Sequence, residues 1–154
     1  SIAAALSNFH GTWRRFEYKG KTKSGAQVYD DYAHHPTAVR NTITELRKKT
    51  EGKVYVAFHP HLYSRTRDLL PDFATAFAGA DTVIIAPIYA AREVDDGTVS
   101  NRILADEIQK HGVHAIALDS FDEIRQKLEE AGEGDVVMTM GAGDIYKVAA
   151  ALVA

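Results

Sequence analysis

Four short segments carry most of the side chains that could perform chemistry. They read Asp30-Asp-Tyr-Ala-His-His-Pro36, His59-Pro-His-Leu-Tyr-Ser-Arg-Thr-Arg67, Pro87-Ile-Tyr-Ala-Ala-Arg-Glu93 and Gly141-Ala-Gly-Asp144. A carboxylate beside a tyrosine can accept hydrogen bonds from ribose hydroxyls while the ring stacks on a base. Arginine and histidine side chains suit phosphate or carboxylate groups. The residue types therefore point to contacts with a nucleotide and with an anionic group.

The arginines have two interpretations. Arg65 and Arg67 lie near the start of an expected helix, where free backbone N–H groups and guanidinium groups together form an anion site. We assign this role to Arg65 and expect Arg67, which faces another side of the helix, to be solvated. Arg14 and Arg15 would ordinarily be charges that keep an edge strand soluble.

The acidic pair also has two interpretations. Asp30 and Asp31 close a predicted strand next to Tyr32, so one carboxylate can bind a ribose. Either residue could instead cap the turn that leads into the next helix. Both interpretations can hold, each for a different member of the pair.

Two further ligands, a zinc ion and a dinucleotide, are suggested by single motifs but are not expected. His34, His35, His59 and His61 suggest zinc, with Asp30 or Asp31 completing the set, but the nearby arginines disfavour a dication. We therefore expect no metal site. Gly141-Ala-Gly143 could open a dinucleotide motif, but Tyr146 is too bulky for its third glycine position. A tight strand-to-helix turn is the favoured interpretation there, and NAD is not expected.

The spacing of hydrophobic residues predicts the strands and helices that position these segments. Runs of consecutive apolar residues predict buried parallel strands near residues 27–31, 53–58, 82–86, 114–118 and 135–140. Spacings of three and four predict the helices between them, one with Pro36 in its first turn, one through Leu69, Phe73 and Phe77, two after Ser100 and Ser120, and one over 145–154. We expect an α/β fold with a Rossmann-like, mostly parallel sheet and helices on both faces. All four of the segments that carry reactive side chains would follow strands and lie on one rim of the sheet.

The N-terminal region departs from this alternation. Residues 14–19 and 26–30 flank a polar loop with glycines at both ends, Gly20 to Gly25, which predicts a hairpin. Its first strand, placed at residues 13–18, would be an antiparallel edge. Residues 1–9 suggest a short Ala-rich helix, and we assign residues 1–10 to a linker from a preceding ATP-binding domain.

Composition bounds the class of protein. The 154 residues are 45% hydrophobic and 25% charged, with a net charge of −3, no cysteine and no initiator Met. These values suit one globular domain and argue against a nucleic-acid partner. No apolar run is long enough to span a membrane. We expect the chain to be part of a longer protein.

With these motifs assembled, the sequence resembles the C-terminal domain of the Mur ligase family from about Asn8 to its end, and we place the domain itself at residues 11–154. The segment Phe9 to Glu17 resembles the stretch that enters that domain, and Asp30 to Thr37 resembles its nucleotide loop. His59 to Thr66 resembles the substrate loop of the branch that adds L-alanine, and differs from the branch that recycles whole muropeptides. Tyr89 to Glu93 and Met140 to Asp144 resemble later rim loops.

The resemblance implies an activity and its site residues. The ligase would phosphorylate UDP-N-acetylmuramate with ATP, and L-alanine would attack the acyl phosphate, in the bacterial cytoplasm, during peptidoglycan synthesis. The N-terminal and central domains of the same chain would be partners, and the central domain would bind most of the Mg²⁺. The residues implied at the nucleotide are Arg15, Asp31, Tyr32 and His34. His61 and Arg65 would face the alanine end as catalytic residues.

Some features of the sequence limit how far the family's activity and site residues can be assigned to this chain. Many relatives have arginine where this chain has Leu62, and Ala33 replaces a frequent glycine. The sequence holds no G-x-x-x-x-G-K-[ST] phosphate loop, so we expect the chain alone to be inactive. The alternatives are the muropeptide (tripeptide) ligase domain, a stand-alone nucleotide-binding module, and a small hydrolase using the histidine and arginine cluster.

Overall fold

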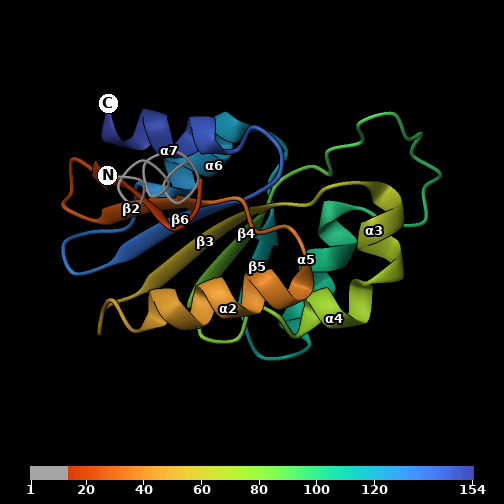
Figure 1. The fold of residues 1–154 in the computed structure, drawn as a ribbon, viewed down its shortest axis with the longest axis horizontal. Helices are drawn as coiled ribbons and strands as arrows, with labels where there is room; N and C mark the ends of the chain where they lie inside the picture. Colours follow the sequence, from red (N-terminus) through yellow and green to blue (C-terminus); the bar gives the residue numbers. More distant parts are fainter. Residues whose placement is uncertain (1–13) are drawn as a thin grey trace, which may run out of the picture.

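A six-stranded sheet organises residues 14–154, the part of the chain that the computed structural model describes (Figure 1). The strand order is β1-β2-β6-β3-β4-β5, and only the β1–β2 pair is antiparallel. The strands are β1 (Glu17–Lys21), β2 (Gln27–Asp31), β3 (Val54–His59), β4 (Thr82–Ile85), β5 (His114–Ala117) and β6 (Val136–Gly141). The prediction of a mostly parallel sheet with an antiparallel edge is confirmed.

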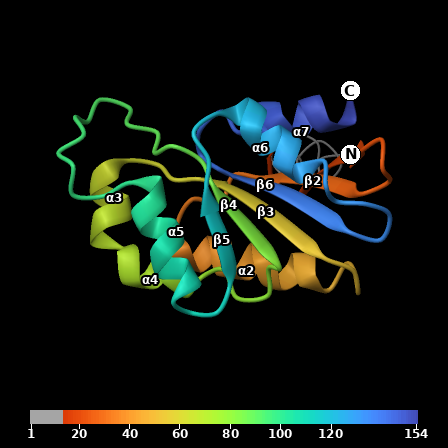
Figure 2. The same cartoon turned by 180° about the vertical axis from the view of Figure 1, so that it is seen from behind.

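Helices cover both faces of the sheet, as predicted (Figures 1 and 2). They are α2 (Pro36–Arg47), α3 (Tyr63–Asp68), α4 (Leu70–Ala74), α5 (Asn101–Gln109), α6 (Phe121–Leu128) and α7 (Tyr146–Val153). Helices α2, α4 and α5 pack on one face, and α6 and α7 pack on the other. Within residues 14–154, none of these helices is long and apolar enough to cross a membrane.

The central strand β3 explains why the strands read as continuous apolar runs. Val54, Val56 and Phe58 join the core beneath α2, α4 and α5. Tyr55 and Ala57 point the other way and join the core beneath α6 and α7. Because side chains alternate along a strand, a strand covered on both faces must be apolar at every position.

The N-terminal hairpin lies further along the chain than predicted. The edge strand spans Glu17–Lys21 rather than residues 13–18, and Gly20 belongs to it as an irregularity in the register. The reason is local, because Arg14 and Phe16 adopt φ angles of 50° and 48°, far from the negative φ values of extended backbone. The proposed helix and linker over residues 1–10 lie outside the described residues.

The helix predicted through Leu69, Phe73 and Phe77 is wrong in its extent. Two short helices, α3 and α4, meet at Leu69, and Phe77 lies in the turn after α4. Pro71 lacks a backbone N–H and favours the first turn of a helix, so it lies in the first turn of α4 and cannot continue α3. Phe73 and Phe77 still enter the core, as their spacing indicated.

Candidate functional site

The four segments singled out by their chemistry meet at one rim of the sheet. The last residues of β2, β3 and β6 are in register, because Asp31 pairs with Met140 and His59 pairs with Gly141. The loops after β3 and β4 are also joined, by an isolated bridge between His61 and Tyr89. In a parallel sheet this is the rim where ligands bind.

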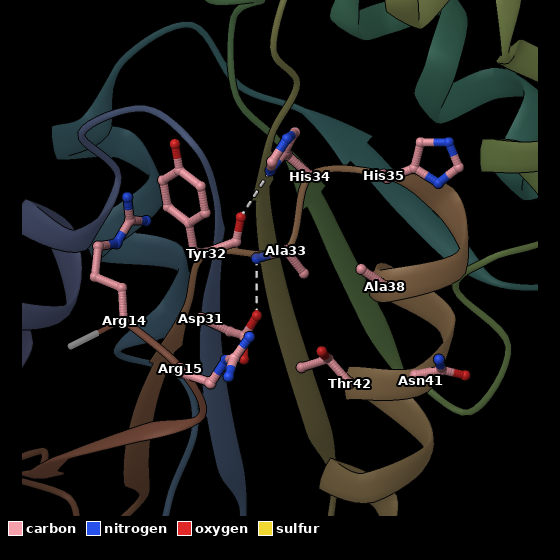
Figure 3. A pocket seen from close by; sticks show the side chains of 10 residues that line it. All are labelled: Arg14, Arg15, Asp31, Tyr32, Ala33, His34, His35, Ala38, Asn41 and Thr42. Carbon is pink, nitrogen blue, oxygen red and sulfur yellow. Dashed lines mark hydrogen bonds between the residues drawn. The ribbon is translucent and has the colours of Figure 1, made fainter. Parts of the chain in front are cut away.

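A cavity of about 680 Å³ opens on this rim between the end of β2 and helix α2 (Figure 3). It is lined by Arg14, Arg15, Asp31, Tyr32, Ala33, His34, His35, Ala38, Asn41 and Thr42. All four residues predicted to contact a nucleotide are therefore brought together. Ala38, Asn41 and Thr42 were not predicted, although their spacing of three and four places them on one side of α2.

Asp31 and Tyr32 form one wall of the 680 Å³ cavity. The Asp31 carboxylate accepts backbone N–H bonds from Phe16 at 2.7 Å and Ala33 at 2.8 Å. The turn-forming interpretation thus holds for Asp31, and the remaining lone pairs of the carboxylate leave it able to accept from a ligand. Burial raises the pKa of Asp31, and the two backbone bonds oppose that shift. The Tyr32 ring is 46% exposed, as stacking on a base requires.

Arg14 contradicts the expectation of a surface charge on the edge strand. It is 2% exposed, and its Nε donates to Asp30 Oδ2 at 2.7 Å. Its Nη1 donates to the carbonyl of Gly143 at 2.7 Å, and Asp30 also accepts from the Thr139 hydroxyl at 2.6 Å. These bonds tie the segment before β1 to β2 and to the turn after β6. Arg15 is exposed and lines the cavity.

The two predicted catalytic residues are also adjacent. The Arg65 Nη1 lies 3.5 Å from His61 Nδ1, and the His61 ring stacks on Tyr89 with centroids 5.4 Å apart. The His34 ring is 6.0 Å from His61, which links this pair to the 680 Å³ cavity. Burial, then the Arg65 charge, lowers the pKa of His61. The imidazole is therefore neutral at neutral pH and Arg65 carries the positive charge.

The start of α3 is not the open anion site that the sequence suggested. Glu93 accepts hydrogen bonds from the Ser64 backbone N–H, at 3.0 Å, and from the Ser64 hydroxyl. A carboxylate from the next loop therefore already occupies the N-terminal N–H groups, and any anion contact falls to the Arg65 guanidinium. Arg67 is exposed and pairs with Asp68 and Asp96.

The Gly141-Ala-Gly143 segment, which begins at the last residue of β6, forms the predicted tight turn toward α7, and the neighbouring His59 explains why glycine is needed there. A Cβ on Gly141 would lie 2.6 Å from the His59 carbonyl oxygen, and one on Gly143 would lie 2.6 Å from His59 Nδ1. His59 is buried, its Nδ1 has no hydrogen-bond partner, and burial lowers its pKa. Between residues 14 and 154, no cluster of three or more histidine or acidic side chains is arranged to hold a metal ion.

Ala33 and Leu62 are the two departures from the resembled pattern. Ala33 is not among the residues with positive φ in the described part of the chain, so alanine fits there without strain. Leu62 has a φ of 71° and precedes α3, and its N–H donates to the Tyr89 carbonyl at 2.8 Å.

Sequence comparison gives a family and several relatives. Residues 14–143 match the family described as Mur ligase, glutamate ligase domain. A UDP-N-acetylmuramate–L-alanine ligase of Clostridium novyi is 47% identical over 149 residues, which are 96% of this chain and 32% of that protein. The chain thus spans about a third of the length of the curated relatives it matches.

Solved structures of Mur ligases are also similar to this chain. The UDP-N-acetylmuramate-alanine ligase of Thermotoga maritima superposes with a TM-score of 0.72 at 28% identity, covering 99% of this chain and 32% of that one. A murein peptide ligase of Psychrobacter arcticus has a TM-score of 0.68 at 25% identity, covering 98% of this chain and 33% of that one.

Proposed function

This chain belongs to the Mur ligase family, and we propose that it is the C-terminal domain of an ATP-dependent ligase that joins L-alanine to UDP-N-acetylmuramate. The N-terminal and central domains of the same protein are its partners in this proposal. The observation that carries the proposal is the convergence on one rim of a nucleotide-sized cavity and the His61–Arg65 pair. The 47% identity to an L-alanine ligase supports the choice of acceptor.

Each predicted residue has a role in this proposal. Asp31 accepts from the ribose and Tyr32 stacks on the base, while Arg15 and His34 line the same cavity. Arg65 stabilises the negative charge that grows when the amine of L-alanine attacks the acyl phosphate. His61, held against Tyr89, directs the guanidinium. In this proposal Mg²⁺ is bound mainly by the central domain of the full-length protein, as the family resemblance implies.

Two alternatives remain within reach of experiment. The 25% identity to a murein peptide ligase keeps a tripeptide acceptor as the second candidate, and the 47% match makes L-alanine the first. A hydrolase using the histidine and arginine cluster is tested by assaying the chain with phosphoesters. We place the ligase in the bacterial cytoplasm because it consumes ATP.

The isolated 154-residue chain provides one test of this assignment. We expect it to fold but neither to hydrolyse ATP nor to ligate L-alanine, because its sequence contains no phosphate loop. Titration calorimetry should give ATP binding of about millimolar strength or weaker, since few contacts offset the entropy of association. The Tyr32→Ala variant should abolish any binding seen. Submicromolar affinity for ATP, or turnover by the chain alone, would refute the division of labour proposed here.

A further inference from the structure

A long loop, residues 86–100, connects β4 to α5. Apart from the bridge at Tyr89, this loop contains no helix or strand. It projects from the sheet beside α3 in both views of the chain (Figures 1 and 2). Loops of this length inside a compact domain are uncommon and are usually functional. Glu93 is the acidic residue of the loop that contacts the start of α3, and no functional role has been assigned to it above.

Helix α3 carries Arg65 but has no capping side chain of its own. Its N-cap residue is Leu62, whose apolar side chain makes no capping hydrogen bond. The first N–H groups of a helix have no partner within it, and Ser, Thr, Asp or Asn at the N-cap ordinarily supplies one. With six residues, α3 is also too short to be stable without tertiary contacts. The direction in which Arg65 points therefore depends on contacts from outside the helix.

Glu93 supplies the missing cap. Its Oε1 accepts the backbone N–H of Ser64 at 3.0 Å, and its Oε2 accepts from the Ser64 hydroxyl. Both carboxylate oxygens thus bind the residue that precedes Arg65. The bonds from the Ser64 hydroxyl and from its backbone N–H lower the pKa of Glu93, so the carboxylate is ionised at neutral pH. A negative charge at this end of a helix is also favoured by the helix dipole.

The 86–100 loop also holds His61. The Leu62 N–H donates to the Tyr89 carbonyl, and the Tyr89 N–H donates to the Pro60 carbonyl, both at 2.8 Å. These two bonds form the bridge at His61, whose ring stacks on Tyr89. One loop therefore fixes His61 through Tyr89 and the start of α3 through Glu93.

We propose that Glu93 is a positioning residue, which holds the Arg65 guanidinium beside His61 for the transfer step. This inference rests on the proposed function and adds to it a residue that acts through Arg65. Arg65 Nη1 and His61 Nδ1 are 3.5 Å apart, a distance too long for this contact alone to fix the guanidinium. A displacement of about 1 Å at a reacting group lowers a rate about a hundredfold, so the cap on α3 matters for turnover.

Steady-state kinetics on the full-length ligase test the role of Glu93. We expect Glu93→Ala to lower kcat about tenfold to a hundredfold and to leave the KM values for ATP and UDP-N-acetylmuramate unchanged. Glu93→Gln should keep most of the rate, because its amide oxygen still accepts the Ser64 N–H. Asp95→Ala is the matched control. It removes a carboxylate that accepts from Gly97 within the same loop, and it should leave kcat unchanged.

Combination with Arg65→Ala distinguishes positioning from a general structural role. If Glu93 acts through Arg65, adding Glu93→Ala to Arg65→Ala should lower kcat no further, because residues that act as a unit have non-additive effects. An unchanged kcat in a folded Glu93→Ala enzyme would overturn the assignment. So would a double variant whose loss is the product of the two single losses.

Hydrogen–deuterium exchange of the peptide around Ser64, followed by mass spectrometry in the full-length protein, needs no substrate. Glu93→Ala should accelerate exchange there, because the Ser64 N–H loses its acceptor, and Asp95→Ala should not. Unchanged exchange in Glu93→Ala would contradict the capping contact. If the wild-type protein forms no amide with L-alanine, the proposed function fails, whereas accelerated exchange still supports the cap on α3.

Discussion

Replacing Arg65 with alanine in the full-length ligase should lower kcat about a hundredfold, the loss of about 3 kcal/mol typical of one donor at a developing charge. The guanidinium lies against His61 at the rim, and its own helix offers no free N-terminal N–H at Ser64, because Glu93 occupies it. Arg65 must therefore stabilise the charge with its side chain. Because that charge grows during transfer, KM for L-alanine should change much less than kcat.

Two further variants make the Arg65 result specific. Arg65→Lys should restore only part of the rate, because an ammonium lacks the planar two-pronged donor geometry. Arg67→Ala should change kcat little, since Arg67 is exposed and pairs with Asp68 and Asp96. Normal turnover by Arg65→Ala, or a loss no greater than that of Arg67→Ala, would reduce Arg65 to a surface charge.

Replacing Arg14 with alanine should destabilise the chain by about 3–5 kcal/mol, because it leaves the Asp30 carboxylate buried without its counter-ion. Both side chains of this pair are almost completely buried, at 3% and 1% exposure. The loss is large compared with the total stability of a domain, so much of the protein should unfold near physiological temperature. Urea unfolding followed by circular dichroism measures the change in the free energy of unfolding.

Matched variants distinguish the effect of breaking the buried Arg14–Asp30 pair from the effect of removing any arginine charge. Arg125→Ala breaks the exposed contacts to Asp122 and Glu129 on α6 and should cost far less stability than Arg14→Ala, because solvent screens exposed ion pairs. Adding Asp30→Asn to Arg14→Met should recover much of the loss, because no buried charge is then left unpaired. A free energy of unfolding for Arg14→Ala equal to that of Arg125→Ala would contradict the buried ion pair.

The fold could be predicted where each local signal agreed with the tertiary structure. The apolar runs of β3 and β6 are typical of strands covered on both faces, and the structure buries every residue of both strands. Ser100 and Ser120 were expected to start helices, and each accepts from a backbone N–H three residues later. The break at Leu69 was missed because the fourfold spacing of apolar residues continued across Pro71.

The location of the site could be predicted from the sequence, but the hydrogen-bond partners of its side chains could not all be predicted. The rim followed from strand ends, and the 680 Å³ cavity gathers the residues assigned to the nucleotide. The partners of Arg14 and Ser64 could not be predicted, because Asp30 is 16 residues away from the first and Glu93 is 29 residues away from the second. Such contacts depend on where the backbone places each side chain, which residue type and spacing do not specify.

Product analysis of the full-length protein tests whether it is a ligase that adds L-alanine to UDP-N-acetylmuramate. The protein is incubated with ATP, Mg²⁺ and UDP-N-acetylmuramate, with either L-alanine or a tripeptide as acceptor, and the products are identified by mass spectrometry. We expect UDP-N-acetylmuramoyl-L-alanine, ADP and phosphate in equal amounts, with L-alanine as the preferred acceptor. Amide formation with the tripeptide and none with L-alanine, or ATP consumption without any amide product, would contradict it.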